Sequence, residues 1–138
     1  MQSILLISHG QMANGVKNAL SMFFGNEVKQ LESLALLPEM GADEFGAQIK
    51  EKLEQLECDD GTVIFADVLG GTPFNQASLL LDEKTDLIVG MNLPMLMEFL
   101  ATREYGRIEI DHLLDVGKQG IVSAKALFSQ ETVEEDDD

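Results

Sequence analysis

Short apolar runs, spaced along the chain, constrain its fold more than any other feature. Residues 3–8 contain an apolar core with no polar alternation, which is typical of a strand buried on both faces of a sheet. Residues 62–66 repeat this pattern, and residues 87–91 are a further strand candidate. Residues 28–34 are more polar and are expected nearer a sheet edge. The sequence therefore predicts four strands.

Helical patterns fill the stretches between these runs. Apolar residues recur at helical spacing from Met12 to Phe24, where Gly25 can end the helix in a left-handed conformation. The later helices are expected to be capped by short polar residues, two of which are followed by a proline in the first turn. These are Asp43, Thr72 with Pro73, Asn92 with Pro94, and Asp111, and the last helix is expected to end near Gly117 or Gly120.

The order of strands and helices predicts the fold class. They alternate as β-α-β-α-β-α-β-α, the pattern of an α/β protein with a doubly wound, mainly parallel sheet and helices on both faces. We expect four strands in the 2-1-3-4 type of order. Residues 121–128 are expected either to extend the last helix or to form a short extra strand.

The length of the chain suits a single domain. It has 138 residues, and we expect the domain to span residues 1–128. Residues 131–138 hold six acids and no base. Residues 129–138 are therefore expected to be an acidic, disordered tail.

Charge and cysteine content exclude several classes of function. The 9 Lys+Arg and 25 Asp+Glu give a net charge of −16, which repels nucleic-acid phosphates and anionic lipids. Cys58 is the lone cysteine, so an internal disulfide framework and a multi-cysteine metal site are excluded, and no other spacing suggests a metal or a cofactor. The apolar run near the N-terminus is too short for a signal peptide, and no stretch is long enough to span a bilayer. We therefore expect a cytoplasmic protein.

Polar residues gather where the predicted strands end. In doubly wound sheets, ligands bind beyond the carboxyl ends of the strands, where the strand order reverses. Ser8-His9-Gly10 ends the first strand, and Asp67 ends the third. If these two strands are neighbours, His9 and Asp67 face each other across the crevice. His9 is then a candidate nucleophile or acid/base, because a carboxylate on one ring nitrogen fixes the tautomer and leaves the other nitrogen free. The alternative is that His9 merely packs at a strand end.

A glycine-rich turn follows Asp67. In Gly70-Gly71-Thr72-Pro73, the glycines allow successive backbone N–H groups to point at one anion, and the next helix adds partial positive charge. The turn has no Gly-Lys-Ser/Thr sequence, so it is not a P-loop. A histidine, a carboxylate and an anion cradle suit phosphoryl transfer through the histidine. Further candidates that could line the site are Ser8, Gly10, Val68, Asn75 and Asn92.

Three segments carry a resemblance to a known family: residues 4–10, 67–75 and 90–96. Together they resemble the IIA domain of the mannose-type (mannose–fructose–sorbose) sugar phosphotransferase system, over residues 4–127. The resemblance implies a phosphohistidine carrier with a doubly wound fold. It also implies homodimers that exchange a C-terminal antiparallel strand, for which residues 121–128 are the candidate.

The resemblance also implies roles for individual residues. His9 would accept a phosphoryl group from phospho-HPr and pass it to a IIB component, and Asp67 would hydrogen-bond His9. Gly71 and Thr72 match the turn that receives the phosphoryl oxygens. Val68 stands where a well-studied member has a polar residue, so only its backbone N–H is expected to contribute. The membrane components IIC and IID would be reached only indirectly.

Two other readings stay open. One is the phosphotransfer subunit of a dihydroxyacetone kinase, which has a similar fold but a different glycine turn. The other is a non-catalytic, anion-binding regulatory module, for which ligand binding would survive His9→Ala. Within the phosphotransferase reading, mannose, fructose, sorbose, an amino sugar and gluconate are all open, because the IIA component never contacts the sugar.

Overall fold

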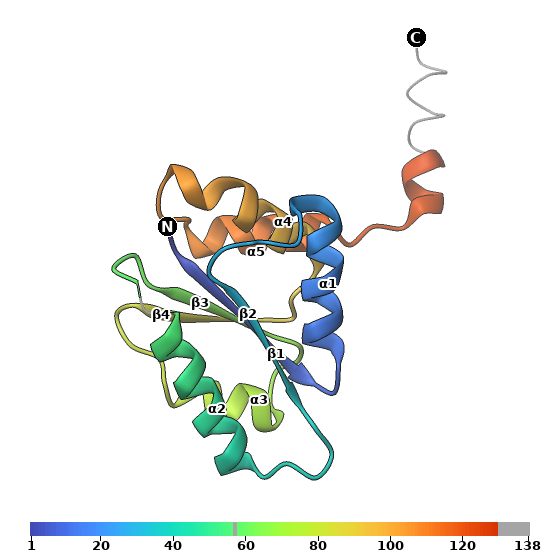
Figure 1. Cartoon of the computed structure of the whole chain (residues 1–138). Helices are drawn as coiled ribbons and strands as arrows, with labels where there is room; N and C mark the ends of the chain where they lie inside the picture. Colours follow the sequence, from blue (N-terminus) through green and yellow to red (C-terminus); the bar gives the residue numbers. More distant parts are fainter. Residues whose placement is uncertain (57, 130–138) are drawn as a thin grey trace.

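A four-stranded, wholly parallel sheet forms the centre of the molecule (Figure 1). The structure is a computed structural model that describes residues 1–56 and 58–129. The strands are β1 Ser3–His9, β2 Leu31–Leu36, β3 Thr62–Ala66 and β4 Thr85–Val89, in the order β2-β1-β3-β4. The predicted α/β class and the 2-1-3-4 order are confirmed. β1 and β3 are central and β2 lies at an edge, as its more polar sequence indicated.

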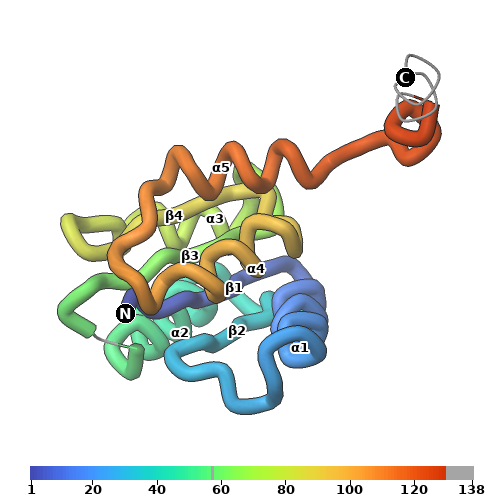
Figure 2. The backbone as a smooth tube through the Cα atoms, turned by 90° about the horizontal axis from the view of Figure 1, so that it is seen from above, coloured from blue at the N-terminus to red at the C-terminus, as the bar shows by residue number. Residues whose placement is uncertain are grey.

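Helices cover both faces of the sheet (Figures 1 and 2). One face carries α1 Met12–Phe24, α4 Leu93–Thr102 and α5 Ile110–Gln119, with the short 3₁₀ helix η1 Arg103–Tyr105 after α4. The other face carries α2 Ala42–Gln55 and α3 Gly71–Ser78. The right-handed crossovers that parallel strands require account for this division into layers.

Side chains of β1 alternate between two hydrophobic cores. Ile4 and Leu6 join the core under α1, α4 and α5, whereas Leu5 and Ile7 join the core under α2 and α3. All four side chains are fully buried. Burial on both faces explains why this strand has no polar alternation in its sequence.

The expected caps of three helices were wrong in position. Asp43 and Asp111 lie in the first turns of α2 and α5, whose N-caps are Gly41 and Glu109. Acids in a first turn face the positive end of the helix dipole, so the same residue type suits both places. α3 begins at Gly71 with Gly70 as N-cap, so Thr72 lies inside the helix and makes no cap hydrogen bond.

The segment after α5 is not a strand. Residues 121–123 have no regular structure, and residues 124–129 are helical and stand away from the sheet (Figures 1 and 2). Ser123 begins this helix, because its Oγ accepts the N–H of Ala126 at 3.2 Å. An exchanged strand forms only against a second copy, so in the single chain these local helix signals decide the structure. Residues 130–138 of the expected tail lie outside the described residues.

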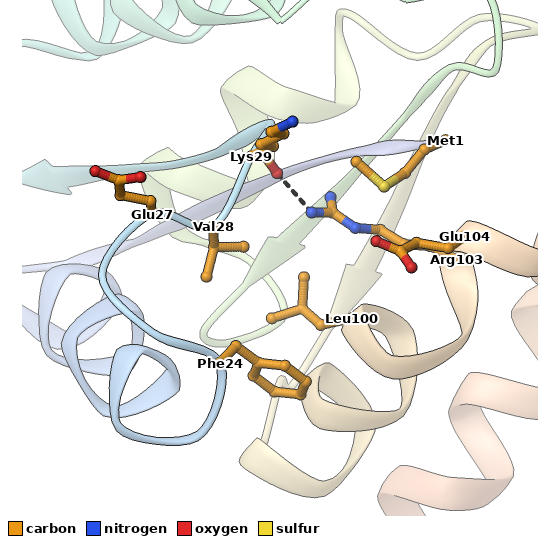
Figure 3. A pocket seen from close by; sticks show the side chains of 8 residues that line it. All are labelled: Met1, Phe24, Glu27, Val28, Lys29, Leu100, Arg103 and Glu104. Atoms are coloured by element: carbon orange, nitrogen blue, oxygen red, sulfur yellow. Dashed lines mark hydrogen bonds between the residues drawn. The ribbon is translucent and has the colours of Figure 1, made fainter.

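Arg103 connects three segments of the chain at the amino ends of the strands (Figure 3). Its side chain is buried, and its guanidinium donates to the carbonyl oxygens of Gln2 at 3.1 Å and Lys29 at 2.5 Å. Burial lowers the pKa of Arg103, while the nearby Glu104 carboxylate acts in the opposite sense. A cavity of about 260 Å³ lies beside it, lined also by Phe24 and Leu100. The bonds of Arg103 therefore connect these segments at the end of the sheet opposite to the strand ends that carry His9 and Asp67.

Asn92 connects α4 to α5. Its Oδ1 accepts the N–H of Met95 at 3.2 Å, which makes it the N-cap of α4 as the sequence predicted. Its Nδ2 donates to the carbonyl oxygen of Gly117 in α5 at 2.8 Å. One amide therefore caps one helix and fastens it to another.

We expect Asn92→Ala to lower the free energy of unfolding by about 1–2 kcal/mol, because it removes an N-cap and leaves the Gly117 carbonyl without this donor. Urea unfolding followed by circular dichroism measures the change. Asn26→Ala, in the exposed loop before β2, is the control and should stay within about 0.5 kcal/mol of the wild type. Equal effects of the two substitutions would contradict the structural role of Asn92.

Candidate functional site

The carboxyl ends of β1 and β3 bring His9 and Asp67 into contact. Ile7 pairs with Ala66, so the two strands end at the same level of the sheet. His9 Nδ1 lies 2.9 Å from Asp67 Oδ2, and the backbone N–H of His9 donates to the same oxygen at 2.9 Å. The Asp67 side chain is 8% exposed and that of His9 is 49% exposed. The carboxylate is therefore sheltered while the imidazole faces solvent.

Hydrogen bonds keep Asp67 ionised. Partial burial raises the pKa of Asp67, but the backbone N–H and the ring of His9 and the N–H of Val68 act together to hold that pKa below its ordinary value. Val68 N–H donates to Asp67 Oδ1 at 2.9 Å. An ionised carboxylate can only accept, so Nδ1 of a neutral His9 must carry the ring proton. The lone pair is then on Nε2, the nitrogen turned away from Asp67.

Gly71 lies against the free edge of the imidazole. A Cβ built on Gly71 would come within 2.9 Å of His9 Cε1 and 3.0 Å of Nε2. Gly71 also has φ of +79°, in the left-handed region. Gly70 has φ of +84°, yet a Cβ there would meet nothing within 4 Å. Both glycines are thus required by backbone conformation, and Gly71 is required by contact as well.

This arrangement can receive an anion next to Nε2. Because Gly71 begins α3, the nitrogen lies at the amino end of that helix, where backbone N–H groups and the helix dipole favour negative charge. The carboxylate on the opposite side of the ring balances the positive charge that the imidazole gains when Nε2 forms a bond. The geometry therefore suits a nucleophilic histidine that carries an anionic group.

Ser8 and Gly10 shape the turn that presents His9. Ser8 is buried, and its Oγ accepts the N–H of Ala13 at 2.7 Å and donates to the carbonyl oxygen of Gly10 at 3.3 Å. Because side chains alternate along a strand, Ser8 points to the face under α1 and His9 to the opposite face. Gly10 has φ of +55° and donates its N–H to the carbonyl oxygen of Leu36 at 2.8 Å. Ser8 and Gly10 therefore position the imidazole by holding the turn that follows β1.

The remaining predicted site residues occupy three different settings. The amide of Asn92 is used between α4 and α5. Val68 is half exposed and contributes its backbone N–H to Asp67. Thr72 and Asn75 lie on α3, and within the described ranges neither makes a side-chain hydrogen bond. The structure thus brings His9, Asp67 and Gly71 together and uses Asn92 elsewhere.

An apolar rim of four exposed residues lies in the segments that adjoin this site, and only Met12 among them was a candidate for such a rim from the sequence. We use this name for Met12, Leu37, Val68 and Leu69, which are 47%, 44%, 51% and 78% exposed. Leu37 was missed because it is far from His9 in the sequence. It lies near His9 only because β1 pairs with β2, which places Leu36 opposite His9. The signal that could have found Leu69 is a large apolar residue between Asp67 and the glycine turn.

No helix in residues 1–56 or 58–129 has the length and hydropathy needed to cross a membrane. Within the same described ranges, no group of three or more His, Cys, Asp or Glu side chains is placed to hold a metal ion.

Comparison with known proteins decides the family. The family model of the mannose-type EIIA proteins, described as the PTS system fructose IIA component, matches residues 3–115. The chain belongs to this family. It is thus a mannose-family IIA component of a sugar phosphotransferase system, a class of phosphotransferase carriers.

Curated relatives share this identity over most of the chain. The fructose-specific EIIA component of Bacillus subtilis (strain 168) is 28% identical over 107 residues, covering 76% of this chain and 73% of the relative. The sorbose-specific EIIA component of Lacticaseibacillus casei is 28% identical over 137 residues, covering 96% and 98%. In the mannose-specific EIIAB component of Escherichia coli (strain K12), the match covers 90% of this chain and 40% of the relative.

Solved structures share the architecture. The phosphotransferase system component EIIA from Streptococcus agalactiae superposes with a TM-score of 0.78 at 26% identity, covering 91% of this chain and 99% of that one. A PTS IIA protein associated with the fucose utilization operon of Streptococcus pneumoniae gives a TM-score of 0.84 at 24% identity, covering 92% and 96%. The second likeness concerns the fold alone.

We expect Asp67→Asn to destabilise the protein at neutral pH and to have little effect in acid. Because the folded-state pKa of Asp67 lies below the ordinary value of 3.8, the ionised carboxylate stabilises the fold above that value. This stabilisation is lost as the pH falls through the folded-state pKa. Urea unfolding of both proteins between about pH 7 and about pH 3 measures the difference at each pH.

Asp59→Asn is the control, because Asp59 lies on an exposed turn and makes no side-chain hydrogen bond within the described residues. Its difference from the wild type should stay within about 0.5 kcal/mol at neutral pH. A difference between wild type and Asp67→Asn that is the same at every pH would contradict the ionised, hydrogen-bonded Asp67.

Proposed function

We propose that this IIA component is a phosphohistidine carrier that accepts a phosphoryl group from phospho-HPr on His9 Nε2 and passes it to a IIB component. The observation that carries the proposal is the bond of 2.9 Å between His9 Nδ1 and Asp67, which leaves Nε2 as the nucleophilic nitrogen beside Gly71. Half of the His9 side chain is exposed, as a group that meets two partner proteins in turn requires.

The transfer step uses groups that the chain itself supplies. The Nε2 lone pair attacks the phosphorus atom, and the bond from phosphorus to the nitrogen of the donor phosphohistidine breaks in line with it. The donor nitrogen keeps the electron pair of that bond. On His9, Nδ1 keeps its proton, so the ring becomes positively charged, and Asp67 balances this charge. Transfer to the IIB component repeats the step with His9 as the donor.

The start of α3 supports the moving phosphoryl group. Three peripheral oxygens carry its negative charge, and catalysis depends on positioning and on stabilising that charge. The N–H groups that follow Gly71 and the hydroxyl of Thr72 are the donors we assign to these oxygens, because they lie at the amino end of α3 next to Nε2. The backbone N–H of Val68 serves Asp67 instead.

We place the carrier in the cytoplasm as a homodimer, with the membrane components IIC and IID as indirect partners. Exposed apolar residues after α5 support a dimer, because Ile121 and Val122 are 77% and 63% exposed. The sugar is open, since the relatives are named for fructose, sorbose and mannose.

Incubation with phosphoenolpyruvate, enzyme I and HPr, read by intact mass, tests the proposal. We expect the wild-type chain to gain the mass of one phosphoryl group in an acid-labile form, and His9→Ala to gain none. His112→Ala is the matched control, because His112 is the other histidine, lies on α5 and is exposed. Asp67→Asn should slow the transfer about 10²-fold or more, because the ring loses the anion that orients it.

A wild-type chain that stays unmodified would overturn the carrier function. Phosphorylation that persists in His9→Ala would move the acceptor to another residue. Unmodified protein that still binds inorganic phosphate after His9→Ala would favour a non-catalytic, anion-binding module. Labelling by dihydroxyacetone kinase subunits, and not by HPr, would favour that kinase system.

Two neighbouring glycines separate contact from backbone strain. Gly71→Ala and Gly70→Ala both place a side chain at positive φ, but only the Gly71 Cβ would reach the imidazole. We expect Gly71→Ala to reduce the rate of phosphorylation at least about tenfold more than Gly70→Ala. Single-turnover phosphorylation rates with phospho-HPr measure this difference. Urea unfolding of both variants checks that they are equally stable under the conditions of the rate measurement. Equal losses in the two variants would attribute the effect to strain alone.

A further inference from the structure

Arg103 is a buried cation without a carboxylate partner among the residues that the structure describes. It is 4% exposed, and its Nη1 and Nη2 donate to the carbonyl oxygens of Gln2 and Lys29 at 3.1 Å and 2.5 Å. These bonds use two of the five N–H groups of a guanidinium. The ion pairs that lysine and arginine side chains form in the described ranges involve Lys17, Lys52 and Arg107. Because a buried charge is costly unless an opposite charge compensates it, the guanidinium of Arg103 is a candidate for binding an anion.

The cavity of about 260 Å³ beside Arg103 has an apolar wall (Figure 3). The wall combines the last residue of α1, a residue of the loop before β2 and a residue of α4, which are Phe24, Val28 and Leu100. Figure 3 shows these three side chains below the guanidinium of Arg103. The volume admits a molecule of about eight non-hydrogen atoms. The cavity therefore offers a positive group at one side and an apolar surface at the other.

Two carboxylates line the cavity, and neither forms an ion pair with Arg103 in the described part of the chain. Glu104 acts on the charge of Arg103 and raises its pKa, against the larger lowering by burial. Glu27 lies on the side of the cavity away from the guanidinium (Figure 3). A ligand with one negative charge therefore suits this cavity better than a dianion such as a phosphate, which the two carboxylates would repel more strongly.

Lys29 is the second cation that an anion in this cavity would meet. It lines the cavity, and its ammonium group makes no ion pair within residues 1–56 and 58–129. Met1 lines the cavity too, but its amino group pairs with Asp60. The planar fork of an arginine matches a carboxylate, whose two oxygens can accept two of its N–H groups. The positive side of the cavity is thus suited to a carboxylate.

We propose that this cavity binds a small carboxylic acid with a short apolar body. The carboxylate accepts N–H groups of Arg103, and the apolar body packs against Phe24, Val28 and Leu100. The site lies at the amino ends of β1 and β2, since Arg103 bonds the residues that precede these strands. His9 lies at the opposite end of β1, so the ligand takes no part in the transfer reaction. The inference does not depend on the proposed function.

An NMR titration of the full chain with isocaproate tests the site. We expect saturable shifts of the backbone amide signals of Val28, Lys29 and Leu100. Isocaproamide has the same shape without the charge, and acetate lacks the apolar body, so each should bind at least about tenfold more weakly. An amide that binds as tightly as the acid would overturn the role of Arg103. Isocaproate that causes no saturable shift of these signals would overturn the site itself.

Two neighbouring phenylalanines test the apolar wall. Phe24 lines the cavity, whereas Phe23 precedes it on α1 and is 59% exposed to solvent. We expect Phe24→Ala to weaken the binding of isocaproate at least about threefold, and Phe23→Ala to change it less than about twofold. Equal losses of affinity in the two variants would remove the wall from the site.

Glu104→Gln tests the charge of the site and leaves Arg103 in place to connect its three segments. Because Glu104 acts on the charge of Arg103, its removal should strengthen the binding of isocaproate about two- to fivefold. Glu83→Gln, on the exposed turn before β4, is the control and should leave the affinity unchanged. An affinity that Glu104→Gln does not raise above that of the control would contradict the pairing of the ligand with Arg103. None of these outcomes bears on the phosphorylation of His9, which the mass measurement tests separately.

Discussion

One carboxylate oxygen determines how the imidazole at the end of β1 is presented. Asp67 Oδ2 accepts both the backbone N–H and the ring nitrogen Nδ1 of His9, each at 2.9 Å. The first bond continues the pairing of β1 with β3 beyond Ala66, and the second orients the ring. Because both bonds end on the same oxygen, the position of the backbone and the tautomer of the side chain are set together. The reactive nitrogen then has one direction to face, toward Gly71.

On a protein this acidic, a site for a phosphoryl group must limit the repulsion between carboxylates and the phosphoryl oxygens. The chain carries a net charge of −16, yet Asp67, the carboxylate of the site, is hydrogen-bonded to Nδ1, the ring nitrogen opposite to Nε2, and is sheltered from solvent. The positive end of α3 and the glycine backbone supply the compensating field without a lysine. Backbone donors hold their positions because the fold holds them, so they need little reorganisation when charge moves. The acidic side chains elsewhere on the surface act on charged partners through long-range electrostatics.

The strands whose bounds were predicted most accurately are those that are buried on both faces. β3 was predicted with its bounds, and β1 to within one residue, because Ile64 and Leu5 belong to runs buried on both faces. The bounds of β2 and β4 moved by two or three residues, since edge strands carry mixed residues that do not mark their ends. The cap residues were misplaced because acids favour the N-cap and the first turn alike. Residues 121–128 were ambiguous, and in the single chain Ser123 and the helix formers after it prevail.

The sequence by itself determined the fold class and the residue types at the site, because apolar runs, helical spacing and turn residues are local patterns. The strand order was expected only as an order typical of that fold class. The sequence also placed His9 and Asp67 at strand ends. Only the tertiary structure decided that Ser8 turns away to hold α1, that Asn92 is used between two helices, and that Gly71 approaches Nε2. Those choices depend on strand register and on which face each side chain takes. They depend on contacts between segments far apart in the chain, which no local pattern encodes.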